Sequence, residues 1–318
     1  DEAPPAIVSM FIGEDLASVL KSIEDNSDYQ KKDKSVMKIG LDVLPSFTKD
    51  TTDRNRTSPF AFTNNKFEFR MLGSTVSIAC PNIMLNTIIA DALSQFADEL
   101  EKADDFTAAL NKLIKRNIKE HKRIIFNGNN YSEEWVEEAK KRGLLNLRST
   151  ADALPYYISS ENIELFKKHG IFSKSEIYSR YEIQLENYCK QIHIEALTMI
   201  DMIKKDILPA ACSYMKDISK EAINKKELCA DISCELEETL LKKLSSLSAD
   251  LYNKMEQLSD MVEPEKEFDC IIEEAKFYRS VLSEQMESTR TIADGIESLV
   301  GAKYWPYPTY GDLLFSVI

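Results

Sequence analysis

The sequence predicts an α+β protein in which a small sheet region is followed by a long-helix bundle. Residues 1–80 contain short apolar or alternating runs of strand length, separated by polar loops. Residues 171–294 contain no glycine, and Pro209 and Pro264 are their only prolines. Such a stretch is typical of long helices, because glycine and proline are the weakest helix formers.

Within the first region, apolar runs predict strands over 6–11 and 36–44, and a helical pattern predicts a short helix over 14–25. The polar residues 26–35 are predicted as a loop. A second loop, over 49–56, leads into a hairpin.

The hairpin is predicted over residues 60–70, with the asparagine pair 64–65 at its turn, because asparagine tolerates the positive φ angles of tight turns. Its second strand alternates strictly between charged and aromatic residues. Alternate side chains of a strand share a face, so this strand has one charged face and one aromatic face. The charged face carries Lys66, Glu68 and Arg70, and the aromatic face carries Phe67 and Phe69.

The charged face, preceded by Arg54 and Arg56, suits an anionic ligand together with a metal. Guanidinium forks hold phosphates and carboxylates, and a glutamate holds a divalent cation. The same pattern is also typical of a solvated face on a half-buried strand, where cross-strand pairs contribute a few tenths of a kcal/mol. The pattern alone names no reaction.

After Pro81 the spacing of the apolar residues becomes helical. Amphipathic spacing predicts helices over 82–102 and 105–123, and residues 127–130 predict a turn. Ser132 and Ser160 are the predicted N-caps of two shorter helices, because serine side chains accept hydrogen bonds from the first turn.

Three apolar stripes predict the core seams of three long helices, not a cofactor site. The first helix is predicted over 175–208, roughly 50 Å long, and ends where Pro209 follows. Pro264 is predicted at the start of the third helix. The stripes are Ile177, Tyr181, Leu185, Tyr188, Ile192, Ala196, Met199 and Ile203; then Leu236, Leu240, Leu244, Leu247 and Leu251; then Phe268, Ile272, Ala275, Leu282, Met286 and Ile296.

The end of the sequence, residues 303–310, alternates aromatic residues with prolines. Proline lacks an N–H group and breaks helices, so this tail is predicted to be non-helical. Its aromatic side chains are predicted to dock on a neighbouring surface, either within the chain or across a subunit boundary.

The composition limits the classes of protein to which this sequence can belong. The 318 residues, 43% of them hydrophobic, are enough for a sizeable core in one large or two medium domains. A net charge of −13 argues against nucleic acid as the main partner. No apolar run approaches the roughly 20 residues of a membrane span. The glycosylation-type sequences at Asn55 and Asn130 matter only in secreted proteins.

Cysteine and histidine usage predicts no disulfide framework and no histidine metal site. None of the six cysteines forms a Cys-x-x-Cys pair, and the three histidines lie far apart. Buried free thiols in a reducing cytoplasm are therefore predicted. The cysteines are Cys80, Cys189, Cys212, Cys229, Cys234 and Cys270.

Four segments resemble type III glutamine synthetase. They are 2–7 (Glu-Ala-Pro-Pro-Ala-Ile), 54–70 with its Arg-Asn-Arg-Thr-Ser-Pro-Phe-Ala-Phe-Thr and Lys-Phe-Glu-Phe-Arg strings, 81–83 (Pro-Asn-Ile) and 305–312 (Trp-Pro-Tyr-Pro-Thr-Tyr-Gly-Asp). The resemblance runs from end to end, but it covers only the C-terminal part of that long enzyme. The second segment is the most specific, and the aromatic–proline ending supports type III in particular.

The resemblance implies a division of the chain into three parts. Residues 1–80 would be the C-terminal part of the catalytic β-sheet domain, 81–302 a helical domain with long antiparallel helices, and 303–318 a docked tail. The sequence departs from the family at Asp1, where asparagine is usual, and at Asn64, where glycine is usual.

The activity that the resemblance implies is ATP-dependent ligation of ammonia to glutamate through γ-glutamyl phosphate. Glu2 aligns with the flap glutamate that takes a proton from ammonium, and Arg56 with the arginine that stabilises the transferring phosphoryl group. Glu68 aligns with a ligand of the metal, Mg²⁺ or Mn²⁺, that bridges the ATP phosphates. Arg70 aligns with the arginine that holds glutamate. Contacts to the nucleotide and its phosphates are implied for Arg54, Arg56 and Lys66.

The resemblance also implies a cytoplasmic homo-oligomer, a ring-type dodecamer, with no nucleic-acid or membrane partner. In the family, the other metal-binding glutamates and a histidine precede the position of Glu2, and nothing in this sequence replaces them. The chain is therefore expected to supply one wall of the active site and to be inactive alone.

Two alternatives stay open on the sequence. The chain could be a helical assembly module without catalysis. It could also belong to a related ligase that joins ammonia or an amine to another carboxylic acid, because Arg70 recognises a carboxylate and not a whole substrate.

Overall fold

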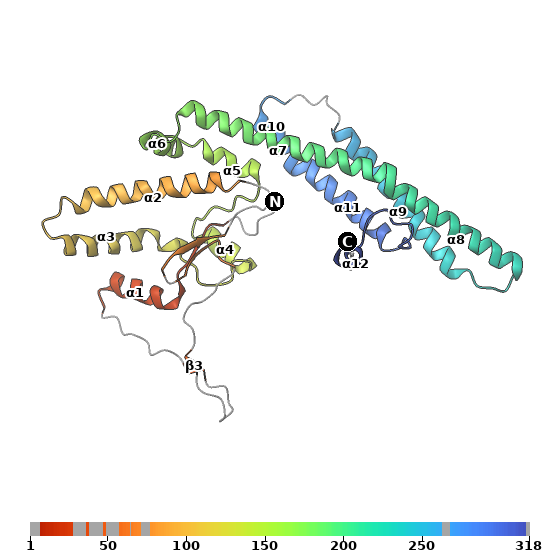
Figure 1. The fold of residues 1–318 in the computed structure, drawn as a ribbon, viewed down its shortest axis with the longest axis horizontal. Coiled ribbons are helices and arrows are strands. Elements are labelled where there is room, and N and C mark those ends of the chain that lie inside the picture. Colours follow the sequence, from red (N-terminus) through yellow and green to blue (C-terminus); the bar gives the residue numbers. More distant parts are fainter. Residues whose placement is uncertain are drawn as a thin grey trace. The chain divides into compact units, whose positions relative to one another are not determined.

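The fold was determined as a computed structural model that describes residues 7–27, 36–37, 47–48, 57–63, 65–70, 77–262 and 268–315 (Figure 1). These residues are mostly helical and include a small mixed sheet, so the α+β prediction is confirmed. The chain packs as two compact units, Asp1–Ile177 and Tyr178–Ile318, each described by itself below. The three-part division made from the sequence stays a prediction.

The sheet of the first unit has the strand order β1-β4-β5. Strand β1 (Met10–Phe11) runs parallel to β4 (Phe60–Phe62), and β4 is antiparallel to β5 (Phe67–Phe69). A separate antiparallel pair joins β2 (Val36–Met37) to β3 (Phe47–Thr48). The predicted hairpin is therefore present, and its first strand lies beside a strand from the start of the chain.

The strands are shorter than the apolar runs that predicted them. Of the run 6–11, only the last two residues form β1, and Ile7 instead lies buried against Trp135 and Ala139. Packing against these side chains removes the apolar side chain of Ile7 from water, so Ile7 is buried without pairing in a sheet. Of the run 36–44, the structure describes only β2; residues 38–44 and the predicted loop 49–56 lie outside the described part of the chain.

Most helices of the first unit lie where the pattern predicted them, although boundaries differ by one to three residues and the helix Thr150–Tyr157 was not predicted. Ser132 caps its helix as predicted, and its Oγ accepts from the amide of Trp135 at 3.3 Å. The next predicted cap moves from Ser160 to Ser159, because Ser159 has the extended backbone that an N-cap requires. The helices are α1 (Gly13–Asp25), α2 (Ala79–Leu100), α3 (Phe106–His121), η1 (Lys122–Ile124), α4 (Glu133–Lys141), α5 (Thr150–Tyr157) and α6 (Ser160–Lys168).

A charged cluster ties the C-terminal end of α6 to α2. Asp91 of α2 accepts from Lys168 Nζ at 2.6 Å and contacts His169 Nε2 at 2.8 Å. Hydrogen bonds from Lys168 and then His169 lower the pKa of Asp91 to about 2. His169 thus pairs with a carboxylate.

The second unit contains three long helices, as the stripes predicted, with two π-helical segments. In Figure 1 the green helix is α7 followed by α8. The elements are α7 (Lys174–Met202), which begins in the first unit, η2 (Ile203–Ile207), α8 (Leu208–Leu228), α9 (Glu235–Val262), α10 (Ile271–Phe277), η3 (Tyr278–Leu282), α11 (Ser283–Glu297) and α12 (Tyr310–Phe315).

The helix predicted to end before Pro209 instead continues through it. Proline has no N–H group, and its ring clashes with the carbonyl four residues earlier in a regular α-helix. Here η2 widens the preceding turn, and the amide of Leu208 donates to the carbonyl of Ile203, five residues earlier. This π-helical turn accommodates the proline, so the boundary predicted at 208 is wrong.

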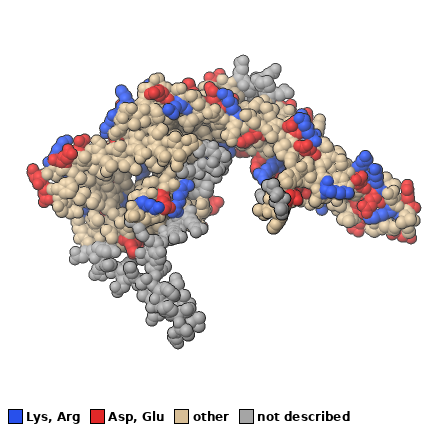
Figure 2. Space-filling view, viewed as in Figure 1, with Lys and Arg blue, Asp and Glu red and all other residues tan. Residues whose placement is uncertain are grey.

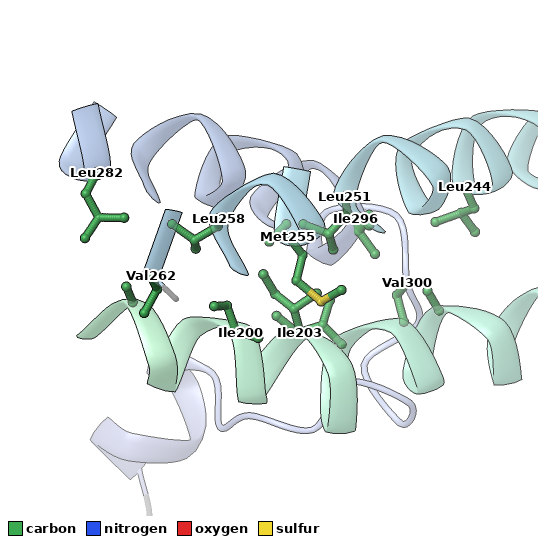
Figure 3. Packing of buried hydrophobic residues seen from close by; sticks show 14 of the residues in the cluster. Ile200, Ile203, Leu244, Leu251, Met255, Leu258, Val262, Leu282, Ile296 and Val300 are labelled. Atoms are coloured by element: carbon green, nitrogen blue, oxygen red, sulfur yellow. The ribbon is translucent and has the colours of Figure 1, made fainter. Parts of the chain in front are cut away.

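The apolar stripes form the core of the second unit. Leu251, Met255 and Leu258 of α9 are completely buried and point toward the helix that carries Ile200 and Ile203 (Figure 3). Helix α11 also packs against α9, and its Ile296 belongs to the same buried cluster. The prediction of core seams is confirmed for most stripe positions.

Leu236 departs from its predicted stripe. Leu236, in the first turn of α9, is 67% exposed, because this turn packs toward α8 through the neighbouring Glu237, which is buried and pairs with Lys225. Pro264 lies outside the described residues, so its predicted place at the start of the third helix is untested.

The aromatic tail docks on the core of its own unit. Tyr304, Trp305 and Tyr307 pack against the buried cluster, and the segment through the prolines is not helical, as predicted. Tyr304 Oη donates to Asp217 at 2.6 Å, and Tyr307 Oη donates to Asp206 at 2.9 Å. Burial, with the bond to Asp206, raises the pKa of Tyr307 to about 12. The sequence left open whether the tail docks within the chain or across a subunit boundary. For Tyr304, Trp305 and Tyr307, the docking surface lies within the chain.

The surface carries both signs of charge. On the face seen in Figure 2, lysine and arginine side chains alternate with acidic ones along the helices. Several form ion pairs one helical turn apart, such as Lys205 with Asp201 and Lys190 with Glu186. No helix of the described ranges is long and apolar enough to cross a membrane.

All six cysteines are free thiols, as predicted, but four of them are exposed. Cys189 and Cys234 are buried, and burial raises the pKa of the Cys189 thiol to about 12. The prediction of general burial is wrong because Cys80 and Cys212 lie on solvent-facing sides of helices, and Cys229 and Cys270 lie at exposed helix ends.

Candidate active site

The charged strand face is the candidate site, and the hairpin fixes its geometry. In the β4–β5 register, Ala61 pairs with Glu68, so both side chains lie on the same face of the sheet. The amide of Thr63 donates to the carbonyl of Lys66 at 2.8 Å and closes the turn. The amide of Arg70 donates to the carbonyl of Pro59 at 2.8 Å and closes the open end of the hairpin.

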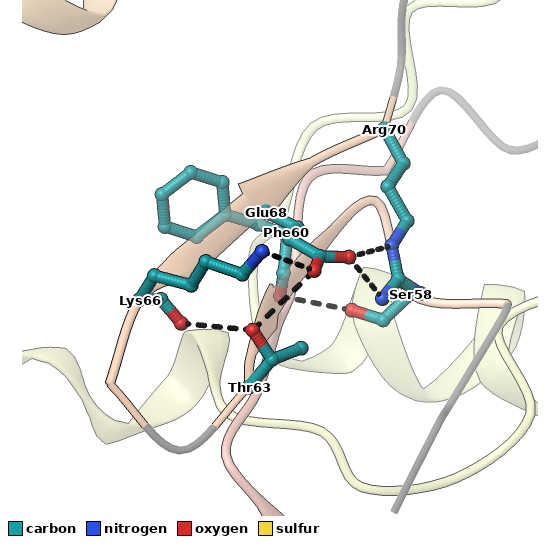
Figure 4. A network of polar contacts seen from close by, with 6 residues as sticks. All are labelled: Ser58, Phe60, Thr63, Lys66, Glu68 and Arg70. Carbon is teal, nitrogen blue, oxygen red and sulfur yellow. Dashed lines mark hydrogen bonds and ion pairs between the residues drawn. The ribbon is translucent and has the colours of Figure 1, made fainter.

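Glu68 lies at the centre of a polar network (Figure 4). Its Oε2 accepts from Arg70 Nη2 at 2.8 Å and from Arg70 Nε at 3.3 Å. Its Oε1 lies 3.3 Å from Lys66 Nζ and accepts from Thr63 Oγ1 at 3.4 Å. The three charged residues singled out from the sequence are thus brought together.

The two cations keep Glu68 ionised. Hydrogen bonds from Arg70 and then Lys66 lower the pKa of Glu68, and the charges of both side chains act in the same direction. The side chain of Lys66 is 65% exposed, whereas that of Arg70 is 28% exposed. The arginine is therefore the more fixed of the two cations, and the lysine is the more accessible to a ligand.

The opposite face of the hairpin carries the predicted aromatic side chains. Phe60 stacks on Phe67 with ring centroids 5.3 Å apart and lies 6.0 Å from Phe69. Phe62 lies 5.2 Å from Phe67. Phe67 nevertheless remains 47% exposed, so this face is only half covered by the described residues.

The other three residues singled out from the sequence, Glu2, Arg54 and Arg56, lie outside the described residues. Their roles stay predictions. The described segments closest to them in sequence begin at Ile7 and at Thr57.

The sequence did not predict the role of the loop that joins these two segments. The side chain of Asn130 is fully buried and donates to Ser9 Oγ at 2.5 Å, and its amide donates to Thr57 Oγ1 at 3.0 Å. Only a turn was predicted here. A cluster of asparagines does not reveal from sequence which of them is buried, so no sequence signal could have found this role. Burial also leaves no room for a glycan on Asn130.

The described residues do not hold a metal by themselves. Nowhere in the described ranges do three His, Cys, Asp or Glu side chains lie close enough together to bind an ion. Glu68 offers one carboxylate, whose chemistry suits Mg²⁺ or Mn²⁺. Both of its oxygens already accept hydrogen bonds from neighbouring side chains. This part of the chain therefore fits the contribution of one ligand only.

Comparison with known proteins finds similarity to glutamine synthetases along the chain. The family model described as "Glutamine synthetase C-terminal domain" matches residues 109–226. A glutamine synthetase of Butyrivibrio fibrisolvens is 44% identical over 320 residues, which is 100% of this chain and 45% of that protein. The resemblance to the C-terminal part of glutamine synthetase is confirmed. A type-3 glutamine synthetase of Dictyostelium discoideum is 38% identical, over 99% of this chain and 44% of its own length.

A glutamine synthetase of Bacteroides fragilis (strain YCH46) is 32% identical over 99% of this chain and 45% of its own length. The chain thus spans a little under half the length of the glutamine synthetases it matches. The family-model match covers α3 to α8 and leaves out the hairpin, so the similarity of the hairpin rests on the aligned relatives.

Proposed function

We propose that the protein containing this chain is a glutamine-forming ligase, which joins ammonia to glutamate at the expense of ATP. The observation that carries this proposal is similarity along the whole chain, at 44% identity, to a protein named glutamine synthetase. The charged face of the hairpin supports it, because that face lies within the aligned region and combines a carboxylate with two cations.

In this proposal each charged residue of the hairpin has a separate role. Arg70 holds the carboxylate of glutamate with its guanidinium fork; in the structure its Nε and Nη2 both donate to one oxygen of Glu68, which keeps the guanidinium on the charged face. Lys66 is exposed and contacts the phosphates of ATP. Glu68 contributes one ligand to a divalent cation, Mg²⁺ or Mn²⁺, that neutralises phosphate charge when bound.

The residues before the hairpin complete the proposed chemistry. Arg54 and Arg56 bind phosphate, and Arg56 stabilises the phosphoryl group as it moves from ATP to the γ-carboxylate of glutamate. Glu2 then accepts a proton from ammonium. The nitrogen forms a bond to the γ-carbonyl carbon, and the bond from that carbon to the phosphate oxygen breaks. The nitrogen gives a second proton to the departing phosphate, which leaves as hydrogen phosphate.

The proposal extends to assembly and location. We propose a cytoplasmic homo-oligomer, a ring-type dodecamer, in which residues 1–80 form part of the catalytic sheet domain. Residues 81–302 form a helical domain, and 303–318 a docked tail. Residues 1–318 alone are proposed to be inactive, because the described part offers one metal ligand.

Replacing Arg70 with lysine should raise the apparent KM for glutamate about tenfold or more and change the KM for ATP much less. Lysine keeps the positive charge but loses the two-pronged grip on a carboxylate. Steady-state kinetics of the protein as its gene encodes it, with each substrate varied in turn, measures both constants.

Arg116→Lys is the matched control for this prediction. Arg116 also grips a carboxylate with two nitrogens, at 3.1 and 2.7 Å from the oxygens of Glu99, but on the helices α2 and α3. This variant should leave both constants unchanged. A rise in the KM for ATP with an unchanged KM for glutamate would remove Arg70 from the glutamate site.

A further inference from the structure

On the charged face of the hairpin, the proposed metal ligand Glu68 and the proposed glutamate-binding residue Arg70 contact each other. Arg70 donates to Glu68 Oε2 from Nη2 at 2.8 Å and from Nε at 3.3 Å. The two residues are two positions apart in the sequence, which places their side chains on the same face of the strand. The backbone of the hairpin therefore holds the two groups side by side.

This contact uses the atoms with which each residue would bind its own ligand. Nε and Nη2 are donors of the fork with which a guanidinium grips a carboxylate, and both point at Glu68 (Figure 4). The other oxygen of Glu68, Oε1, lies 3.3 Å from Lys66 Nζ and accepts from Thr63 Oγ1 at 3.4 Å. A cation at Glu68 and a carboxylate at Arg70 would each compete with a partner that is already in place.

The pair is open enough for such competition. The side chain of Glu68 is 37% exposed and that of Arg70 is 28% exposed, so ligands can reach both. Ion pairs that are partly exposed to water are weak, because the solvent screens the two charges. A bound carboxylate or a bound dication can therefore replace one partner of the pair.

Replacement on one side helps binding on the other. Glu68 that ligates a dication gives up its negative charge to that ion, and the guanidinium of Arg70 is then released and repelled by the added positive charge. Arg70 that grips a substrate carboxylate in turn leaves Glu68 without its strongest hydrogen-bond donor, so Glu68 is freed to ligate a cation.

We propose that the Glu68–Arg70 ion pair couples the binding of the divalent cation to the binding of glutamate. This inference rests on the proposed function and adds to it a means of regulation: without the cation, Glu68 occupies Arg70 and weakens the binding of glutamate. Because binding equilibria are linked, each ligand raises the affinity for the other by the same factor, about fivefold or more.

The first test is the binding of isotopically labelled glutamate, measured by equilibrium dialysis in the presence of a chelator, to the protein as its gene encodes it. Glu68→Gln should bind glutamate about fivefold or more tightly than the parent, because it has no charge to hold Arg70. Glu68→Asp keeps the charge but shortens the side chain away from Arg70, so it should also bind more tightly. A long-range charge effect alone would strengthen binding only in the glutamine variant.

The second test measures the coupling itself in the parent protein, so it does not depend on whether any variant folds. Adding Mn²⁺ should raise the affinity for glutamate about fivefold or more, and glutamate should raise the affinity for Mn²⁺, followed by electron paramagnetic resonance, by the same factor. Glu68→Gln should lose most of this mutual effect.

Glu99→Gln is the matched control, because Glu99 is also held by two nitrogens of an arginine, Arg116, but on the helices α2 and α3. This variant should bind glutamate as the parent does, with and without Mn²⁺. An effect equal to that of Glu68→Gln would contradict the role of the hairpin pair.

The failure of this inference differs from the failure of the proposed function. In a parent protein that forms glutamine, glutamate affinity independent of Mn²⁺, or metal-free binding that does not tighten in Glu68→Asp, would overturn the coupling alone. A folded parent protein that neither binds glutamate nor forms glutamine would overturn the proposed function and the coupling together.

Discussion

Replacing Glu68 with alanine should lower glutamine formation about a hundredfold or more. Glu68 is the one carboxylate in the hairpin network and would contribute a metal ligand. Its loss also leaves the cations of Lys66 and Arg70 without the acceptor that orients them. Steady-state glutamine formation at saturating magnesium measures the loss.

Two further variants serve as comparisons. One tests whether the charge of Glu68 matters more than its size, and the other tests whether loss of any surface carboxylate has the same effect. Glu68→Gln keeps the size of the side chain but not its charge, so it should lose nearly as much activity as Glu68→Ala. Glu101→Ala removes an exposed carboxylate at the end of α2 and should have no effect. Activity of folded Glu68→Ala within a few-fold of the parent would exclude Glu68 from the active site.

Replacing Leu251 with alanine should destabilise the second unit by about 2–5 kcal/mol. Leu251 is completely buried in α9, within the cluster that joins α7, α9 and α11. Truncation removes buried apolar surface and leaves a cavity, because a close-packed core relaxes only in part. Hydrogen exchange of the α9 amides reports the free energy of opening of this unit.

Leu236→Ala is the matched control, because Leu236 lies on the same helix and is 67% exposed. It makes the same chemical change where little packing is lost, so the exchange of α9 should stay nearly unchanged. Equal effects of the two substitutions would contradict the placement of the core.

The sequence was sufficient for features that depend on local periodicity. Strict alternation placed Lys66, Glu68 and Arg70 on one strand face, and the structure brings these three side chains together. The spacing of the stripes predicted the buried positions Leu244 and Leu251. Both patterns follow from the geometry of one element, so no knowledge of its neighbours was needed.

Features that depend on tertiary contacts could not be predicted from the sequence. The helix passes through Pro209 because a π-helical turn absorbs the proline, and nothing in the local pattern distinguishes this from a helix end. Leu236 follows the stripe but is 67% exposed, because the first turn of α9 is buried through Glu237 instead. Asn130 joins segments far from it in sequence, 121 residues away at Ser9 and 73 residues away at Thr57.

The central proposal, that the protein containing this chain is a glutamine-forming ligase, is tested most directly by product analysis of the protein as its gene encodes it. Incubation with ATP, glutamate and isotopically labelled ammonium should give labelled glutamine, ADP and phosphate in equal amounts. Residues 1–318 alone should give none of these products while remaining strongly helical by circular dichroism. Amide formation with a different acid, ATP hydrolysis independent of glutamate, or glutamine formation by residues 1–318 alone would contradict the account.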